Sequence, residues 1–512
     1  MRLRWFFITS IFYAVGCFAQ NPNVFNPQAI TVAVDKIPTS FNPFADQKLI
    51  EEQFKHLLFD PLFRWDQQQQ LEARLVKHWK RINNKTIRFY LRKDIYFHSG
   101  NTLTAKDVIW SFEQAKNNSK LRFFNKIDAI TSNDSNSFDI HSKLNEIQLL
   151  DDLTNLFVLD SAFYQSNKRL LDTPPSIILP PITELTMSGT GPYLVQKYNP
   201  VLGVLVIANN NYWGGALPTK FFRFMRVNKP QSRLFALLAN DVQVSYAVPN
   251  KFINDLAENT STRLVQVPSS NAIFLAINDQ LSPLLSDNKV REAIHMAINQ
   301  PGMLKYILKD NGQIHPSVMA FADNSLVQKE DKKTLLMPEY NLEKAKKILQ
   351  VQPLPKQMSL LVMLDDVGNT SKVADALIHM FDKIGVNLVV QEVSSQDVWD
   401  NTNLYYDFTI SSWQTNLMSK DNIYEDLFKN SFLTGYLEDK FKQKKIAGNF
   451  QSQADYFQKL QQDNWIFPLF YQDKIWAQNN QFNLQDIFSS NGIPYWSLFK
   501  VNKGSTLSNQ DG

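Results

Sequence analysis

Residues 91–112, LRKDIYFHSGNTLTAKDVIWSF, join an extended basic segment to an amphipathic helix. Just upstream, residues 86–92 alternate between apolar and polar side chains, which is the period of a strand with one buried face. Residues 99–101 form a turn, and Thr104 with Asp107 three residues later is a variant of the capping box that begins a helix. The apolar residues that this helix is expected to bury are Val108, Ile109 and Phe112. The stretch therefore predicts a strand, a turn and a helix in succession.

Candidate catalytic and metal-binding groups are scarce in the sequence. His98 has no second ligand at metal-binding spacing, so we interpret it as a hydrogen-bonded structural histidine. The neighbours Asp151 and Asp152, like Asp365 and Asp366, cannot both face one site in a regular strand, and we expect all four to be solvated. The sequence contains no nucleophile elbow, zinc-protease motif, P-loop or dinucleotide fingerprint. It therefore predicts no catalysis, no metal site and no cofactor.

The length and charge of the chain limit its class. Its 512 residues exceed the ~250 to 300 residues at which one hydrophobic core stops growing, so two or three lobes are expected. Hydrophobic residues make up 44% of the sequence, which is enough for such cores. The formal net charge is +4, and lysines are spread along the chain rather than clustered. Nucleic acid is therefore not an expected partner.

The N-terminus has the composition of a secretory signal peptide. Residues 1–20, MRLRWFFITSIFYAVGCFAQ, combine a basic start, an apolar segment and small residues near the end. We expect cleavage after residue 19, which removes Cys17, the only cysteine, and leaves an exported protein without thiols. The alternative is lipidation of Cys17, because residues 14–17, AVGC, resemble a weak lipobox. In both cases no disulfide forms within the mature chain.

A second block, residues 188–198 with the sequence SGTGPYLVQKY, precedes apolar-rich segments that predict strands of a sheet. Gly189 and Gly191 are expected to adopt backbone angles that other residues avoid. Tyr212 and Trp213 follow in the run YWGG, and we interpret them as packing aromatics rather than as ligand contacts.

A third block begins with AIFLAIND at residues 272–279 and continues with SDNKVREAIHMAINQPGML at residues 286–304. Apolar residues recur in the second part at helical spacing. Ser286 is the candidate N-cap of this helix, and Pro301 is expected to end it.

Together the three blocks resemble the extracytoplasmic solute-binding proteins of family 5, which deliver peptides, nickel complexes and related solutes to ABC importers. The first block is similar to the family pattern LR-x-x-V-x-F-H-x-G-x-x-x-T-A-x-D-V. The second is similar to GTGPY followed by N-x-x-YW-G, and the third to F-x-x-x-N followed by D-x-x-V-R-x-A-I-x-x-A-I. The resemblance extends from about residue 30 to about residue 496, which is nearly the whole mature chain.

This resemblance implies an α/β fold of the bilobal periplasmic-binding-protein type, in its large three-domain form. Mixed sheets flanked by helices are expected, with the ligand cleft between the two lobes. The expected division is residues 25–60, 185–268 and 484–512 for a discontinuous first lobe, 61–184 for an intervening small domain and 269–483 for the second lobe.

One loop departs from the family pattern. Peptide-binding members follow a strand with D-x-x-x-x-x-W-x-x-D-Y-x-D/E-P, and the central aspartate pairs with the ligand's α-ammonium. Asp407 and Trp413 match this pattern, but Asn416 stands at the central position. An amide cannot neutralise an ammonium charge in a dry cleft. Three hypotheses follow: the cargo lacks a free amine, Asp421 supplies the charge from a shifted loop, or the loop has changed while peptides still bind.

For a peptide cargo, the resemblance implies an extended ligand whose backbone pairs with receptor strands. The expected ligand contacts are Ser40, Phe41, Asn278, Trp413, Thr415 and Asn416. The lobes are expected to close around the ligand by a hinge motion, and the closed form to dock on the permease.

The function that the resemblance implies is an exported, periplasmic and monomeric receptor of an ABC importer, with a peptide or peptide-like ligand and a permease in the inner membrane as partners. A ligand sensor related to the effector half of sugar-stress transcription regulators is an alternative. It would need a helix-turn-helix domain where the signal sequence stands. Receptors of non-peptide solutes and an enzyme that recruited the fold are further alternatives, because a fold alone does not determine function.

Overall fold

The computed structural model describes residues 29–44, 49–117, 122–166, 187–315, 338–363, 369–393, 405–415, 417–419, 422–423, 427 and 453–501. The expected signal peptide with Cys17, the pair Asp365 and Asp366, and the loop residues Asn416 and Asp421 lie outside this part of the chain. Among the described residues, no helix is long and apolar enough to cross a membrane.

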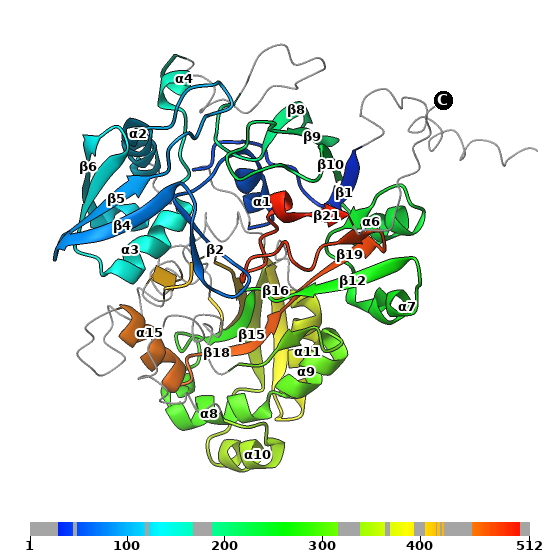
Figure 1. Ribbon diagram of the computed structural model, residues 1–512. Helices are drawn as coiled ribbons and strands as arrows, with labels where there is room; N and C mark the ends of the chain where they lie inside the picture. The colour runs from blue at the N-terminus through cyan, green and yellow to red at the C-terminus, as the bar shows by residue number, and fades with distance from the viewer. Residues whose placement is uncertain are drawn as a thin grey trace, which may run out of the picture.

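The first lobe is built around a mixed sheet of seven strands in the order β12-β19-β11-β1-β10-β9-β8 (Figure 1). The strands are β1 Ile30–Val34, β8 Tyr193–Asn199, β9 Gly203–Ala208, β10 Phe221–Arg226, β11 Val244–Ser245, β12 Thr262–Val267 and β19 Lys474–Asn479. The helices of this lobe are α1 Leu49–Leu58, α6 Pro230–Leu238 and α7 Ile253–Ala257. The central strand β1 is buried throughout and pairs in parallel with β10 and β11. Such burial on both faces is typical of the parallel part of a sheet.

The small domain carries an antiparallel sheet in the order β4-β5-β7-β6, and α2 packs against its edge strand β6 (Figure 1). Its elements are β4 Val76–Asn83, β5 Thr86–Leu91, α2 Ala105–Lys116, β6 Ile127–Asp134, β7 Ser137–Ser142, α3 Glu146–Asp152 and α4 Ser161–Ser166. A hairpin of β2 Phe63–Trp65 and β3 Leu71–Ala73 precedes it. The strand and the helix predicted around residues 91–112 are β5 and α2, and the backbone amide of Thr104 donates to the Asp107 carboxylate at 2.8 Å. The structure therefore confirms this part of the sequence analysis.

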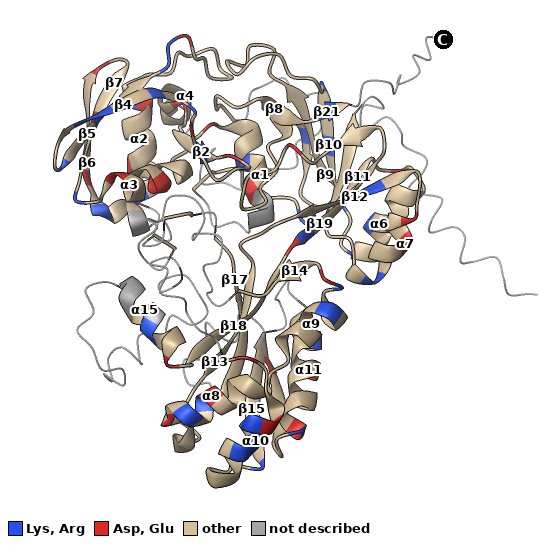
Figure 2. Ribbon diagram, turned by 60° about the horizontal axis from the view of Figure 1, so that its bottom comes forward, with Lys and Arg blue, Asp and Glu red and all other residues tan. Residues whose placement is uncertain are grey.

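The second lobe is a six-stranded sheet in the order β14-β18-β13-β17-β15-β16. The strands are β13 Ala272–Ile277, β14 Gly312–Gln313, β15 Gln357–Met363, β16 Asn387–Val393, β17 Phe408–Trp413 and β18 Ile466–Gln472. The helices are α8 Asn288–Ala297, α9 Gln300–Ile307, α10 Leu342–Val351, α11 Thr370–Asp382 and α15 Gln453–Gln462. Every residue of β13 is buried, and β17 and β18 flank this strand in the sheet. Figure 2 shows acidic and basic residues interspersed along α8 and α10.

The third sequence block folds as expected in outline but not at its ends. Its apolar residues are buried in α8, as the helical spacing predicted. The N-cap is Asp287 rather than Ser286, because its carboxylate accepts a hydrogen bond from the amide of Lys289 at 2.8 Å. Pro301 does not end α8, which stops at Ala297. It stands in the first turn of α9, where a missing amide costs nothing.

Two large hydrophobic cores follow this arrangement. One core is continuous through the first lobe and the small domain, and the other fills the second lobe. The chain passes between the sheets where β12 leads to β13 and where β18 leads to β19. The expected boundary of the second lobe at residue 483 is wrong at this end, because β19 pairs with β12 and β11 in the first sheet. Asp473 alone separates β18 from β19, so the chain passes from one sheet to the other within a single residue.

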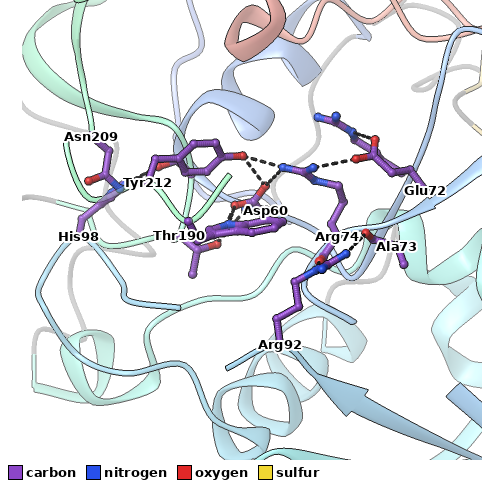
Figure 3. A network of polar contacts seen from close by, with 12 residues as sticks. Asp60, Glu72, Ala73, Arg74, Arg92, His98, Thr190, Asn209 and Tyr212 are labelled. Carbon is purple, nitrogen blue, oxygen red and sulfur yellow. Dashed lines mark hydrogen bonds and ion pairs between the residues drawn. The ribbon is translucent and has the colours of Figure 1, made fainter. Parts of the chain in front are cut away.

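A buried polar network fastens the small domain to the first lobe (Figure 3). The Asp60 carboxylate accepts hydrogen bonds from Thr190 at 3.1 Å, Trp213 at 2.8 Å and Tyr212 at 3.3 Å, and pairs with Arg74 at 3.2 Å. Arg74 also donates to the Tyr212 hydroxyl at 2.6 Å and lies over the Trp213 ring. Burial alone would lower the pKa of Arg74, but the charges of Asp60, Tyr212 and Glu72 together outweigh burial and raise that pKa. Tyr212 and Trp213 are thus structural residues, as the sequence analysis interpreted them.

The two glycines of the second block serve a different purpose from the one expected. Neither has a positive φ. A Cβ atom on Gly189 would lie 2.2 Å from the carbonyl oxygen of Leu58, and one on Gly191 would lie 2.3 Å from the carbonyl carbon of the same residue. The motif needs glycine because two backbone segments approach closely, and not because of unusual backbone angles.

His98 is a structural histidine that joins the loop before α2 to the segment containing Gly189 and Gly191. Its ring accepts a hydrogen bond from the Gly189 amide at Nδ1 and donates from Nε2 to the Gly191 carbonyl at 2.9 Å. Burial lowers the pKa of His98 to about 4. The ring is therefore neutral in the folded protein across the physiological range.

This pKa predicts a specific loss of stability in acid. An unfolded histidine takes up a proton below about pH 6.5, whereas folded His98 stays neutral down to about pH 4. Its contribution is therefore complete above pH ~6.5 and declines as the pH falls, by about 2 kcal/mol at pH 5. We expect His98→Gln, which retains an amide donor for Gly191, to show a smaller difference in unfolding free energy between pH 7.5 and pH 5 than the wild type. Urea unfolding at both values measures it, and equal pH dependence would contradict the assignment.

Candidate ligand-binding site

The ends of the strands meet between the two lobes. In the first sheet, β1, β10 and β11 run in parallel, so their carboxyl ends lie at one edge. In the second sheet, β15 and β17 are parallel, and β18 runs the same way as β17 because both are antiparallel to β13. In open α/β sheets, ligands bind outside the carboxyl ends of parallel strands. Here the carboxyl-end edges of the two sheets border the same space between the lobes.

A cavity of about 640 Å³ occupies this space, which is a volume typical of sites for small molecules. From the first lobe, residues that follow β1, β10 and β11 line it, including Asp35 and Tyr246. From the second lobe come the end of β17 with Trp413 and the start of α11 with Lys372. The two segments that cross between the lobes complete the wall, among them Lys474. The cavity is thus shared by both lobes and by the connections between them.

Charged groups of both signs line the cavity. They are Asp35, Arg233, Lys251, Lys372, Asp473 and Lys474. Burial lowers the pKa of Lys474 to about 8, so its ammonium is charged at neutral pH but poorly solvated. Burial also raises the pKa of Asp473, although Gln266 donates a hydrogen bond to its carboxylate at 2.7 Å. Among the described residues, no carboxylate forms an ion pair with Lys474, so its charge is available to a ligand.

Arg233 is part of the wall rather than a free ligand contact. Its side chain is 1% exposed. It donates to the carbonyl oxygens of Tyr246 at 2.8 Å, Val227 at 2.7 Å and Asn228 at 3.1 Å. Burial lowers its pKa, and the carboxylate of Asp35 opposes this effect. The guanidinium therefore holds the ends of β10 and β11 together at the rim of the cavity.

Of the expected contacts, Trp413 lines the cavity. Thr415 lies just beyond it and is held by Ser270, whose hydroxyl donates to the Thr415 carbonyl at 2.6 Å. Asn416, the residue of greatest interest in this loop, lies outside the described residues. The loop after β17 therefore begins at the cavity.

The other expected contacts lie elsewhere. Phe41 is 7% exposed and packs edge-on against Tyr198 with ring centroids 5.1 Å apart, so it is a core residue. The Ser40 hydroxyl accepts a hydrogen bond from the amide of Asn42 at 3.1 Å, as in a local turn. Asn278 follows the end of β13 that is far from Trp413, since Ala272 at the near end is the strand partner of Trp413. At about 3.3 Å per residue, the six steps from residue 272 to residue 278 span roughly 20 Å. The structure does not place these three residues among the residues lining the cavity.

The expectation that Asp151 and Asp152 are solvated is wrong. Both are 0% exposed. Burial raises the pKa of Asp151 to about 6, opposed by hydrogen bonds to its carboxylate from the amides of Ser419 and Met418 and the side chains of Asn422 and Trp65. Three of these four donors belong to the loop that follows β17 in the second lobe. Such partners are distant in sequence, so no local pattern could reveal them.

The sequence analysis also missed most of the cavity wall. Asp473 and Lys474 carried a usable signal, because they interrupt the otherwise apolar run of residues 466–477, IFPLFYQDKIWA. Burying a charge inside such an apolar run costs free energy, so these residues indicate a functional or structural role. Both line the cavity.

Comparison with known proteins shows what the chain resembles. The sequence profile of the bacterial extracellular solute-binding proteins, family 5 Middle, matches residues 70–433. The dipeptide-binding protein of Escherichia coli K12 is 25% identical over 296 residues, which are 53% of this chain and 55% of that protein. The chain thus aligns with about half the length of this relative. Nickel-binding protein NikA of Staphylococcus aureus NCTC 8325 is 23% identical over 360 residues, 70% of this chain and 69% of that protein.

Two solved structures show the same fold over nearly the whole chain. NikZ from Campylobacter jejuni, in complex with Ni(L-His), matches with a TM-score of 0.70 and 17% identity, covering 92% of this chain and 98% of that one. DppA from Helicobacter pylori, in complex with the peptide STSA, matches with a TM-score of 0.69 and 18% identity, covering 92% and 97%. The bilobal α/β fold expected from the sequence is confirmed.

Proposed function

Because the chain belongs to the family 5 bacterial extracellular solute-binding proteins, which are transport receptors and not enzymes, we propose that it captures a peptide or peptide-like solute for an ABC importer. The observation that carries this proposal is the cavity between the lobes, where the carboxyl ends of strands from both sheets converge. Trp413, Thr415 and Asn416 remain the proposed contacts from the loop after β17. Ser40, Phe41 and Asn278 are no longer proposed as contacts.

The charges around the cavity support a zwitterionic solute. Four cationic side chains and two carboxylates line it. A peptide carries both an ammonium and a carboxylate, and excess positive charge in the wall favours the carboxylate end. Dipeptide-, murein peptide- and glutathione-binding proteins among the relatives have ligands of this chemistry. We assign Lys474 and Lys372 as candidate partners of the ligand carboxylate.

The rest of the proposal concerns the compartment and the partners. The protein is exported through the segment 1–19 and works as a monomer in the periplasm, with lipidation at Cys17 as the alternative to release. It delivers its cargo to an inner-membrane permease. The division into a discontinuous first lobe, a small domain and a second lobe is kept, with β19 moved to the first lobe.

The test of this function is the identity of the bound solute. The mature protein, purified without added ligand from its own host, is denatured, and the released molecules are identified by mass spectrometry. Thermal unfolding with Ala-Ala, tri-alanine, N-acetyl-tri-alanine, glutathione and a nickel–histidine mixture follows. Short peptides in the released fraction and a rise in Tm with tri-alanine support the proposal. Stabilisation by the nickel–histidine mixture alone, with no peptide released, would refute it.

Lys474→Met gives a sharper prediction for the same site. The substitution keeps an unbranched apolar stem and removes the ammonium. We expect the affinity for tri-alanine to fall about tenfold, the loss of roughly 1.5 kcal/mol from one charge-assisted hydrogen bond. Isothermal titration calorimetry measures the change. The control is Lys347→Met on the exposed surface of α10, and equal affinities for both variants would remove Lys474 from the site.

A further inference from the structure

The Asp151 carboxylate joins the small domain to the second lobe. The two oxygens of Asp151, in α3, accept hydrogen bonds from the backbone amides of Met418 at 3.0 Å and Ser419 at 2.8 Å. The side-chain amide of Asn422 donates to the same carboxylate at 3.0 Å and to the Gln148 carbonyl at 2.9 Å. Two backbone groups and one side chain of the second lobe therefore converge on the last turns of α3.

The position of Asp151 within its own domain does not explain this carboxylate. It lies in the last turn of α3, where the helix dipole disfavours negative charge. On its own side it accepts one further hydrogen bond from the Trp65 ring nitrogen, at 2.9 Å. A buried carboxylate is tolerated only when several donors satisfy it. Most of these donors come from across the lobe boundary.

The two sides of this contact belong to different hydrophobic cores. Leu150 and Leu153, on either side of Asp151 in the chain, pack in the core that the small domain shares with the first lobe. Leu417 and Ile423, on either side of the donors, pack in the core of the second lobe. Separation of the lobes would leave the Asp151 carboxylate to water and expose the amides of the loop.

We infer that Asp151 is a latch, which holds the second lobe closed against the small domain and positions the loop that carries the ligand contacts. The loop begins after Trp413, the last residue of β17, which lines the cavity. The amide of Leu417 donates to the Thr415 hydroxyl at 3.2 Å, so the latched segment is tied directly to the residues near the ligand. Asp151 is a positioning residue. Its effect on ligand affinity rests on the proposed function, whereas the contact between the small domain and the second lobe is independent of that function.

Hydrogen exchange tests the latch without any ligand. Asp151→Ala removes the acceptor, and Asp128→Asn, an exposed carboxylate of the same domain, is the matched control. We expect exchange of the Met418 and Ser419 amides to become at least about tenfold faster in Asp151→Ala, while peptides from β13 and β5 stay protected. Unchanged exchange at both amides would overturn the inference. If Asp151→Ala does not fold, Asn422→Ala removes one donor from the opposite side and is expected to accelerate the same two amides.

A distance measurement separates a latch from a purely local contact. With Cys17, the only cysteine, replaced by serine, spin labels are placed at the exposed positions Lys85 in the small domain and Lys347 in α10. Pulsed electron resonance should show a broader distribution, with longer distances, in Asp151→Ala than in the wild type or in Asp128→Asn. Identical distributions would refute a role in closure. Either result is independent of whether any solute is found in the purified protein.

Discussion

Gly191→Ala is expected to lower the free energy of unfolding by about 3 kcal/mol or more, the upper end of the cost of overpacking. The added Cβ would lie 2.3 Å from the carbonyl carbon of Leu58 and 2.6 Å from the carbonyl oxygen of Leu57. Both atoms are backbone at the end of α1, so they cannot rotate away as a side chain can. The Gly191 amide would also be pushed from the Leu58 carbonyl, to which it donates at 3.1 Å. Urea unfolding followed by circular dichroism measures the effect.

Gly385→Ala is the matched control for this steric explanation. Gly385 has φ +81°, and a Cβ there would meet no atom within 4 Å. Its substitution carries the cost of a left-handed backbone alone, about 1 to 2 kcal/mol. A cost of Gly191→Ala no larger than that of Gly385→Ala would mean that α1 shifts to make room, and the close-approach explanation would then be wrong.

Asp60→Asn is expected to destabilise the protein by about 3 to 5 kcal/mol, because it removes the charged partner of a buried cation. The substitution keeps the shape of the side chain. Arg74 would retain its contact with Glu72 at 2.8 Å, but Glu72 is 36% exposed and cannot compensate fully. The amide group would also direct hydrogen atoms at the donors Thr190 and Trp213, which now share one carboxylate oxygen.

The partly exposed ion pair between Arg88 and Asp139 provides the comparison. Its geometry is as good as that of the buried pair, with contacts of 2.7 and 2.9 Å, but the Arg88 side chain is 33% exposed and the Asp139 side chain 11%. Asp139→Asn should cost less than Asp60→Asn, because solvent reaches the Arg88 guanidinium and screens the pair. Arg74→Met in the Asp60→Asn background should recover part of the loss, since no unpaired buried charge remains. Equal losses of unfolding free energy for Asp60→Asn and Asp139→Asn would show that burial does not determine how strongly the network stabilises the fold.

Local patterns predicted the elements that depend on neighbours in sequence. The alternation in residues 86–92 and the capping pair Thr104 and Asp107 correspond to β5 and to the start of α2. The burial pattern of α8 also followed its helical spacing, while its N-cap moved by one residue to Asp287. These features need only period and capping chemistry, which a few consecutive residues contain.

Features that join distant segments could not be predicted in the same way. The need for glycine at position 191 depends on α1, more than a hundred residues earlier, and not on its own backbone angles. The burial of Asp151 depends on amides that come 267 and 268 residues later in the chain. Both were misjudged because adjacent acidic residues and glycines have common local explanations.

Three blocks of local pattern and their order are shared with one family of bilobal receptors, so the class of the protein can be recognised without its structure. The residues that form the cavity, the sheet to which β19 belongs and the surroundings of Asp151 become clear only in the folded chain. The difference lies in the range of the interactions. Periodicity, capping and turns act over a few residues, whereas a cavity wall and a contact between lobes consist of groups that only the folded chain brings together.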